Sequence, residues 1–177
     1  MNKKFFLINL VCLFLVSFLV KAENSNSKMK LYSFYTPTHK ILKDEHFLPT
    51  LQDDYEVIIE FYDEKAGCPS GEYGTLGFNQ TVLKKADLMI RAIRENWGKV
   101  FVYADVDIQF FSSVEQLILK AVENHDMAFQ IEKLKSGSSL KDCINGDLSQ
   151  AKNDPNTGFI VCKGNERTLF FWKTVKE

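Results

Sequence analysis

The chain has 177 residues, of which 45% are hydrophobic and 25% are charged, and its formal net charge is −1. This length suffices for one domain with a buried core, and the composition excludes a disordered or collagen-like chain. Lys and Arg form no cluster after the N-terminus, so we expect no nucleic-acid partner.

The N-terminal segment has the layout of a secretory signal peptide. Lys3 and Lys4 precede an apolar run over residues 5–20, and a small side chain suits cleavage after Ala22. We therefore expect residues 1–22 to be removed, and the protein to enter the secretory pathway or to be exported. Its destination would be the lumen of the endoplasmic reticulum or Golgi, the extracellular space or a periplasm. The alternative is an uncleaved membrane anchor, although a spanning helix usually needs about 20 apolar residues.

Three cysteines remain after that cleavage: Cys68, Cys143 and Cys162. An exported chain could form one disulfide from them, and the sequence does not specify the pair. No Cys-x-x-Cys spacing occurs and the three histidines are scattered, so we expect no zinc site.

Residues 23–29 are polar and are expected to form a linker, followed by one domain over residues 30–177. Pro37 and Pro49 bracket a loop or short helix. Apolar and aromatic runs predict strands at 30–36, 55–62, 99–111, 125–132 and 156–164. Residues 133–155 carry many turn-forming residues and are expected to form a loop.

Helical periodicity precedes the third strand. The residues that share its apolar face are Val82, Leu83, Ala86, Met89, Ile90, Ile93 and Trp97. Gly98 should end this helix, Ser112 or Ser113 should cap the next, and Asn165 should cap a C-terminal helix. Strands that alternate with helices predict an α/β fold with a mostly parallel sheet flanked by helices.

The third predicted strand contains two acids, Asp105 and Asp107, within an otherwise apolar run. Ligands in parallel α/β sheets bind at the carboxyl ends of strands, and side chains two residues apart on a strand point the same way. The two carboxylates could therefore converge on Mg²⁺ or Mn²⁺, ions that prefer oxygen ligands. The alternative is a polar turn that only ends the strand.

Two other readings of the acids fail on neighbouring residues. A phosphatase with an aspartyl-phosphate intermediate would carry Thr or Val four residues after the first acid, where this chain has Gln109. An EF-hand loop would require Gly and Glu at its sixth and twelfth positions, where Phe110 and Gln116 stand.

Three ordered elements resemble the nucleotide-diphospho-sugar transferase family, glycosyltransferases with the GT-A fold. They are the basic helix and strand "LKKADLMIRAIRENWGKVFVYADVDIQFF", the strand "NTGFIVCKG" and the aromatic helix after it, and the match spans Phe78 to Trp172. The resemblance implies a GT-A-like, Rossmann-type sandwich. It also implies metal-dependent transfer of a sugar from a nucleoside diphosphate to a hydroxyl of a glycan or protein acceptor.

The resemblance implies a role for each matching residue. Asp107 would bind the Mn²⁺ or Mg²⁺, and Asp105 would contact the ribose, the metal or a metal-bound water. The remaining donor-binding residues would be Lys85, with Lys84 second, and Ser33, Tyr35 and Thr36 on the first strand. The residues on the sugar and acceptor side would be Asn156, Thr157 and Gly158. The alternatives are a solvated helix face for the lysines and a simple turn for residues 156–158.

Family members usually continue beyond the last helix, so the resemblance implies a shortened C-terminal part. We therefore expect either an enzyme whose acceptor site a partner completes, or a secreted non-catalytic module that binds nucleotide sugars, glycans or proteins. A third alternative is a structural domain in which lysines neutralise the two acids.

Overall fold

The computed structural model describes residues 28–63, 76–131 and 155–177. The expected signal peptide, most of the linker, Cys68, Cys143 and nearly all of the loop expected at 133–155 lie outside these residues. Within the described part, no helix is long and apolar enough to cross a membrane.

Five strands form one sheet in the order β2-β1-β3-β5-β4. Their bounds are β1 Lys30–Tyr35, β2 Glu56–Phe61, β3 Val100–Ala104, β4 Met127–Ile131 and β5 Pro155–Lys163. β1 is parallel to β2 and β3, whereas β5 is antiparallel to both of its neighbours. Four strands therefore run the same way, which confirms the predicted mostly parallel α/β sheet.

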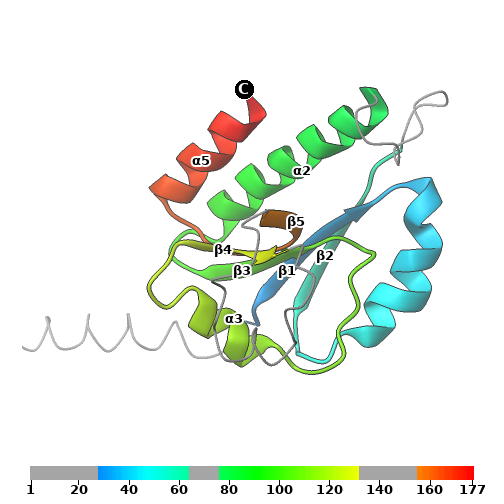
Figure 1. Ribbon diagram of the computed structural model, residues 1–177, viewed down its shortest axis with the longest axis horizontal. Helices are drawn as coiled ribbons and strands as arrows, with labels where there is room; N and C mark the ends of the chain where they lie inside the picture. The colour runs from blue at the N-terminus through cyan, green and yellow to red at the C-terminus, as the bar shows by residue number, and fades with distance from the viewer. Residues whose placement is uncertain (1–27, 64–75, 132–154) are drawn as a thin grey trace, which may run out of the picture.

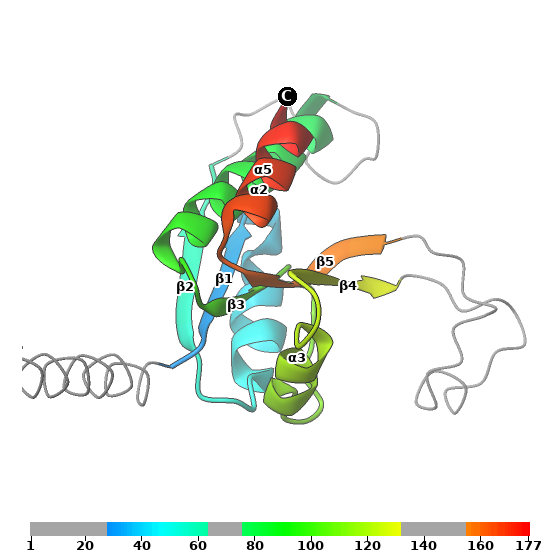
Figure 2. The same cartoon turned by 90° about the vertical axis from the view of Figure 1, so that its left-hand side faces the viewer.

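Helices cover both faces of the sheet, as Figures 1 and 2 show. The α-helices are α2 Leu76–Glu95, α3 Glu115–Ala121 and α5 Glu166–Lys176. Between β1 and β2 lie three short helical turns, η1 Pro37–His39, η2 Leu42–Phe47 and η3 Leu48–Thr50. α2 and α5 pack on one face, and α3 and the η turns lie against the other.

The sheet has a hydrophobic core on each face, because side chains alternate between the two faces along each buried strand. On the neighbouring strands β1 and β3, Tyr32 and Tyr103 face the core beneath α2 and α5, while Leu31 and Val102 face the opposite core. All four side chains are fully buried. Each strand in the middle of the sheet must therefore be largely apolar on both faces.

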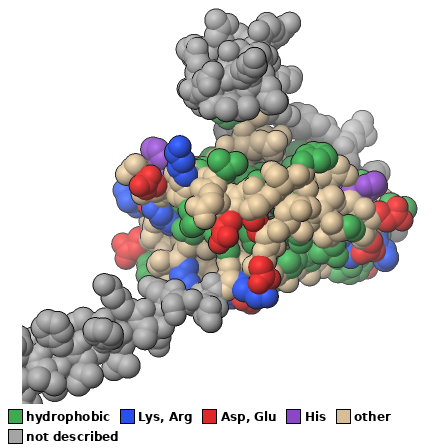
Figure 3. Space-filling model, turned by 90° about the horizontal axis from the view of Figure 1, so that it is seen from below, with side chains coloured by type: hydrophobic (Ala, Val, Ile, Leu, Met, Phe, Trp, Pro, Cys, Tyr) green, Lys and Arg blue, Asp and Glu red, His purple; other side chains and the backbone are tan. Residues whose placement is uncertain are grey.

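The surface carries mixed charge. On the face that Figure 3 shows, Lys and Arg side chains of the described residues are scattered among Asp and Glu. A broad basic surface, as nucleic-acid binding requires, is therefore not formed on that face by the described residues.

The predicted helix before β3 is confirmed, but its predicted apolar face is not buried throughout. It spans Leu76–Glu95, and Gly98 follows it with a positive φ of 74°. Ala86 and Met89 are buried as predicted, but Val82 is 42% exposed and Trp97 is 52% exposed. Trp97 lies beyond the end of the helix, and the first turns of α2 border the cleft described below instead of packing on the sheet.

The predicted cap of α3 is wrong, whereas that of α5 is confirmed. Asn165 and Thr168 form a reciprocal capping box at α5. At α3 the N-cap position is Val114, and the acceptor comes from a distant segment: Asp53 accepts hydrogen bonds from the Val114 amide (2.8 Å) and from the Ser113 hydroxyl. Ser113 thus serves as a donor to Asp53 and not as the cap.

Asp53→Ala should lower the free energy of unfolding by about 1–2 kcal/mol, because it removes the acceptor for the first turn of α3. Burial raises the pKa of Asp53, but hydrogen bonds from Ser113, the Val114 amide and Tyr55 outweigh this and lower it overall. The contribution of Asp53 to the free energy of unfolding should therefore be complete above the ordinary pKa of 3.8. It should shrink as the pH falls through the lower pKa of the folded protein.

Urea denaturation at neutral and acidic pH measures the contribution of Asp53. Asp54→Ala, which removes only an exposed pair with Lys28, is the matched control.

Candidate functional site

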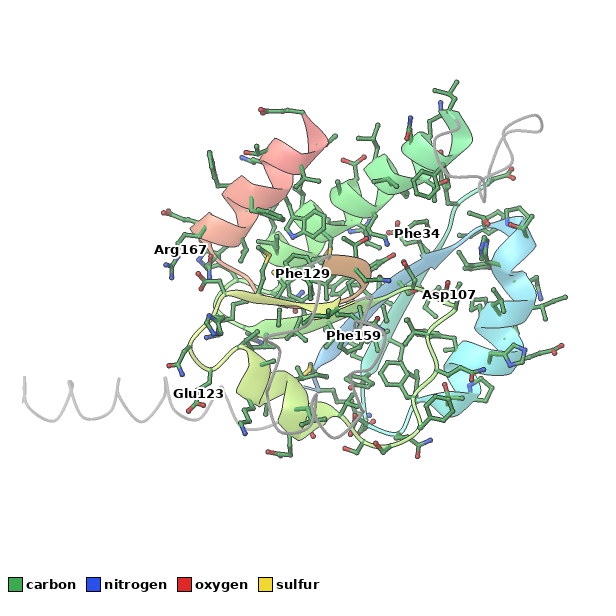
Figure 4. The ribbon with its side chains drawn as sticks, in the orientation of Figure 1. Phe34, Asp107, Glu123, Phe129, Phe159 and Arg167 are labelled. Atoms are coloured by element: carbon green, nitrogen blue, oxygen red, sulfur yellow. The ribbon has the colours of Figure 1, made fainter. Side chains whose placement is uncertain are left out.

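A cleft of about 420 Å³ opens where the carboxyl ends of β1 and β3 meet the start of β5. Four segments line it: the end of β1 with η1, the first turns of α2, the residues after β3, and residues 156–158. Figure 4 labels Phe34 and Asp107, which both lie at this end of the sheet.

The antiparallel direction of β5 brings residues 156–158 to this cleft. Because β5 runs against β3, the start of β5 lies beside the end of β3, and Ala104 pairs with Phe159. The Asp105 amide donates to the Gly158 carbonyl oxygen at 2.7 Å. A Cβ atom on Gly158 would lie 2.9 Å from Asn156 Oδ1 and 3.4 Å from Asp105 Oδ2, so glycine keeps this approach open.

Asp105 is held by neighbours on two elements. Its Oδ2 accepts from Lys85 Nζ of α2 at 2.8 Å, and its Oδ1 accepts from the Tyr103 hydroxyl of β3. Burial raises the pKa of Asp105 and nearby Asp107 adds to that rise, whereas Lys85 and Tyr103 oppose it; the net shift is upward.

Asp107 differs from Asp105 in its surroundings. It is exposed, lines the same cleft, and makes no hydrogen bond or ion pair with any residue that the structure describes. The strand ends at Ala104, and Asp107 lies in the turn that follows. The prediction that alternation along the strand brings the two carboxylates together is therefore wrong. A turn after the strand brings the Asp107 carboxylate to the cleft.

The two predicted lysines, Lys84 and Lys85, point to different places. Lys85 is largely buried, and its Nζ also donates to the Thr157 carbonyl oxygen at 3.1 Å. Lys84 pairs with Glu60 at 3.4 Å, outside the cleft. Of the two predicted basic residues, the structure places only Lys85 beside the acids.

Only some of the predicted donor-binding residues of the first strand line the cleft. Tyr35 and Thr36 line the cleft, whereas Ser33 is fully buried and does not. The Ser33 hydroxyl has no hydrogen-bond partner among the described residues. A serine inside the sheet cannot contact a ligand in the cleft, so its predicted role in donor binding does not fit this geometry.

Sequence reasoning missed His39. It ends η1, lines the cleft, and has its Nδ1 2.7 Å from the Thr36 hydroxyl oxygen, which leaves Nε2 for other partners. Its position just beyond the carboxyl end of a predicted parallel strand was a usable signal. The apolar wall was missed as well; it comprises Phe34, Phe78, Val82 and Val106, and Thr81 lies beside it.

The carboxylates of the cleft could supply some, but not all, of the ligands of a hard divalent metal ion. Two carboxylates line the cleft, and no group of three His, Cys, Asp or Glu side chains that could hold a metal occurs among the described residues. Mg²⁺ usually takes one or two carboxylates and completes its shell with waters and substrate phosphates, and Mn²⁺ prefers the same ligand types. Asp107, exposed and unpaired within the described residues, therefore fits as a direct ligand, whereas Asp105 already has two donors.

Comparison with known proteins gives one family. The family model described as nucleotide-diphospho-sugar transferase matches residues 44–177. This range contains α2, β3, β4, β5 and α5, and therefore both acids and Lys85. No curated protein and no solved structure matches the chain.

Proposed function

The chain belongs to the nucleotide-diphospho-sugar transferase family, and from this premise we propose that its cleft binds a nucleotide sugar with Mn²⁺ or Mg²⁺ and transfers the sugar to an acceptor hydroxyl. One observation carries the proposal. Asp105 and Asp107, in the turn after β3, and Lys85, on α2, line one cleft at the carboxyl end of the parallel strands, where such folds bind ligands.

The charge of the cleft supports metal dependence. Its two carboxylates outnumber its one ammonium group, so a doubly or triply charged diphosphate would be repelled without an added cation. A bound divalent ion would neutralise this repulsion and act as a Lewis acid for the charge that develops on the leaving diphosphate.

Different residues of the cleft would contact the metal, the phosphates, the nucleoside and the sugar. Asp107 would hold the metal, and Lys85 would supply positive charge beside the phosphates while it orients Asp105. Tyr35 and Thr36 would contact the nucleoside, since they line the cleft at the end of β1. Asn156, Thr157 and Gly158 would form the sugar side, where the Lys85–Thr157 contact fixes the start of β5.

Calorimetry on the wild-type protein tests the proposal. We expect UDP or GDP, with or without its sugar, to bind when Mn²⁺ or Mg²⁺ is present and to release no heat of binding in EDTA. No binding of any nucleoside diphosphate with metal would contradict both the transferase and a nucleotide-binding module. The third alternative, a structural domain, would then remain, and the Asp105–Lys85 pair is the observation in its favour.

Product formation separates the enzyme from the module. A transferase should release nucleoside diphosphate from a sugar donor, faster when acceptor is added, whereas a secreted non-catalytic module should bind donor without turnover. We propose export of the protein from its N-terminal sequence.

A further inference from the structure

Tyr103 contacts two of the charged residues that line the cleft, Asp105 and Lys85. Its side chain is fully buried on β3, its hydroxyl donates to Asp105 Oδ1, and its ring centroid is 5.0 Å from Lys85 Nζ. The ring also packs against Phe34, with centroids 6.4 Å apart. One side chain thus contacts both members of the Asp105–Lys85 pair and is itself fixed by the core.

We propose that Tyr103 is a positioning residue that holds Asp105 and Lys85 in the arrangement used to bind the nucleoside diphosphate. This inference rests on the proposed function of the cleft. The hydroxyl fixes one carboxylate oxygen and Lys85 fixes the other, so the carboxylate cannot rotate while both contacts persist. The face of the ring also attracts the ammonium group, which keeps Lys85 over β3.

A second tyrosine shows what a structural role alone would look like. Tyr32 pairs with Tyr103 across β1 and β3, and both are fully buried. The Tyr32 hydroxyl, however, donates to Glu95 at 2.7 Å and accepts from Asn96 at 2.8 Å, near the C-terminal end of α2 and away from the cleft. Loss of the Tyr32 hydroxyl removes two hydrogen bonds and loss of the Tyr103 hydroxyl removes one, but only the Tyr103 hydroxyl contacts a residue that lines the cleft.

Tyr103→Phe and Tyr32→Phe therefore form a matched pair. Both should fold and both should melt at somewhat lower temperature, since each keeps its ring and loses a hydrogen bond to a charged group. Calorimetry with Mn²⁺ and UDP should show about tenfold weaker binding for Tyr103→Phe, a typical effect of losing a group that orients a ligand-binding side chain, and unchanged binding for Tyr32→Phe. Equal affinity for both variants and wild type would overturn the proposal.

A ligand-free measurement separates this proposal from the proposed function. In ¹³C-detected NMR without nucleotide, the Asp105 carboxyl resonance, assigned with Asp105→Asn, should shift in Tyr103→Phe and stay unchanged in Tyr32→Phe. If wild-type protein binds no nucleotide, the proposed function fails while this shift still supports positioning of Asp105. An unmoved Asp105 resonance in Tyr103→Phe would overturn the positioning role in either case.

Discussion

Asp107→Asn should abolish metal-dependent nucleotide binding while the protein stays folded. We expect affinity to fall by at least about a hundredfold, roughly 3 kcal/mol, because the amide cannot supply the negative charge that the metal and diphosphate require. Stability should not fall, since Asp107 is exposed and has no bonded partner within the described residues. Its removal also relieves repulsion on Asp105, whose pKa it helps to raise. Calorimetry with Mn²⁺ and UDP, alongside thermal melting, measures both effects.

The control for this variant is Asp54→Asn. It makes the same chemical change at an exposed acid that is paired with Lys28 outside the cleft. Nucleotide affinity of this control should equal that of wild type. If Asp107→Asn bound nucleotide and metal as tightly as the control, Asp107 would not be the metal ligand and the proposed clamp would have to be abandoned.

Lys85→Met should reduce both stability and nucleotide binding. It leaves the Asp105 carboxylate without its ammonium partner in a partly buried site, where removal of one member of an ion pair is costly. Because the Asp105 side chain is 31% exposed, we expect a loss of about 1–3 kcal/mol, less than for a fully buried pair. Urea denaturation measures the stability, and calorimetry should show nucleotide affinity lowered by about tenfold or more.

Lys84→Met is the matched control for Lys85→Met, since it makes the same change one residue earlier on α2. Lys84 pairs with Glu60, which keeps Arg91 as a second partner, so stability and affinity should change little. The double variant Lys85→Met/Asp105→Asn should regain part of the lost stability, because the unpaired charge is gone, without regaining affinity. Equal effects of the two single variants would contradict the assignment of Lys85 to the site.

The sequence predicted the local parts of this fold well. Each strand appeared as an apolar or aromatic run, and Asn165 was visible as the cap of α5 because the helix begins at the next residue. Such features depend on short-range spacing, which the sequence displays directly. The cap of α3 was missed because its acceptor, Asp53, lies about 60 residues earlier, and only folding brings the two together.

Within the site, the sequence identified the residue types but not every direction in which they point. Consecutive residues on a helix point about 100° apart, so the spacing could not decide whether Lys84 or Lys85 reaches the acids. Likewise Ser33, Tyr35 and Thr36 lie in or just after β1, yet only the last two line the cleft. His39 was missed although it follows the carboxyl end of a predicted parallel strand, because only the fold shows that η1 turns toward the cleft.

By itself the sequence determined the family, the mostly parallel α/β sheet and the two acids within the third predicted strand, since each depends on local pattern and composition. Tertiary structure alone decided how those acids differ. The strand ends at Ala104, so Asp105 stays beside Tyr103 and Lys85 while Asp107 is carried by a turn into the open part of the cleft. Burial and long-range partners distinguish two identical side chains, and both arise only when α2, β3 and β5 pack together.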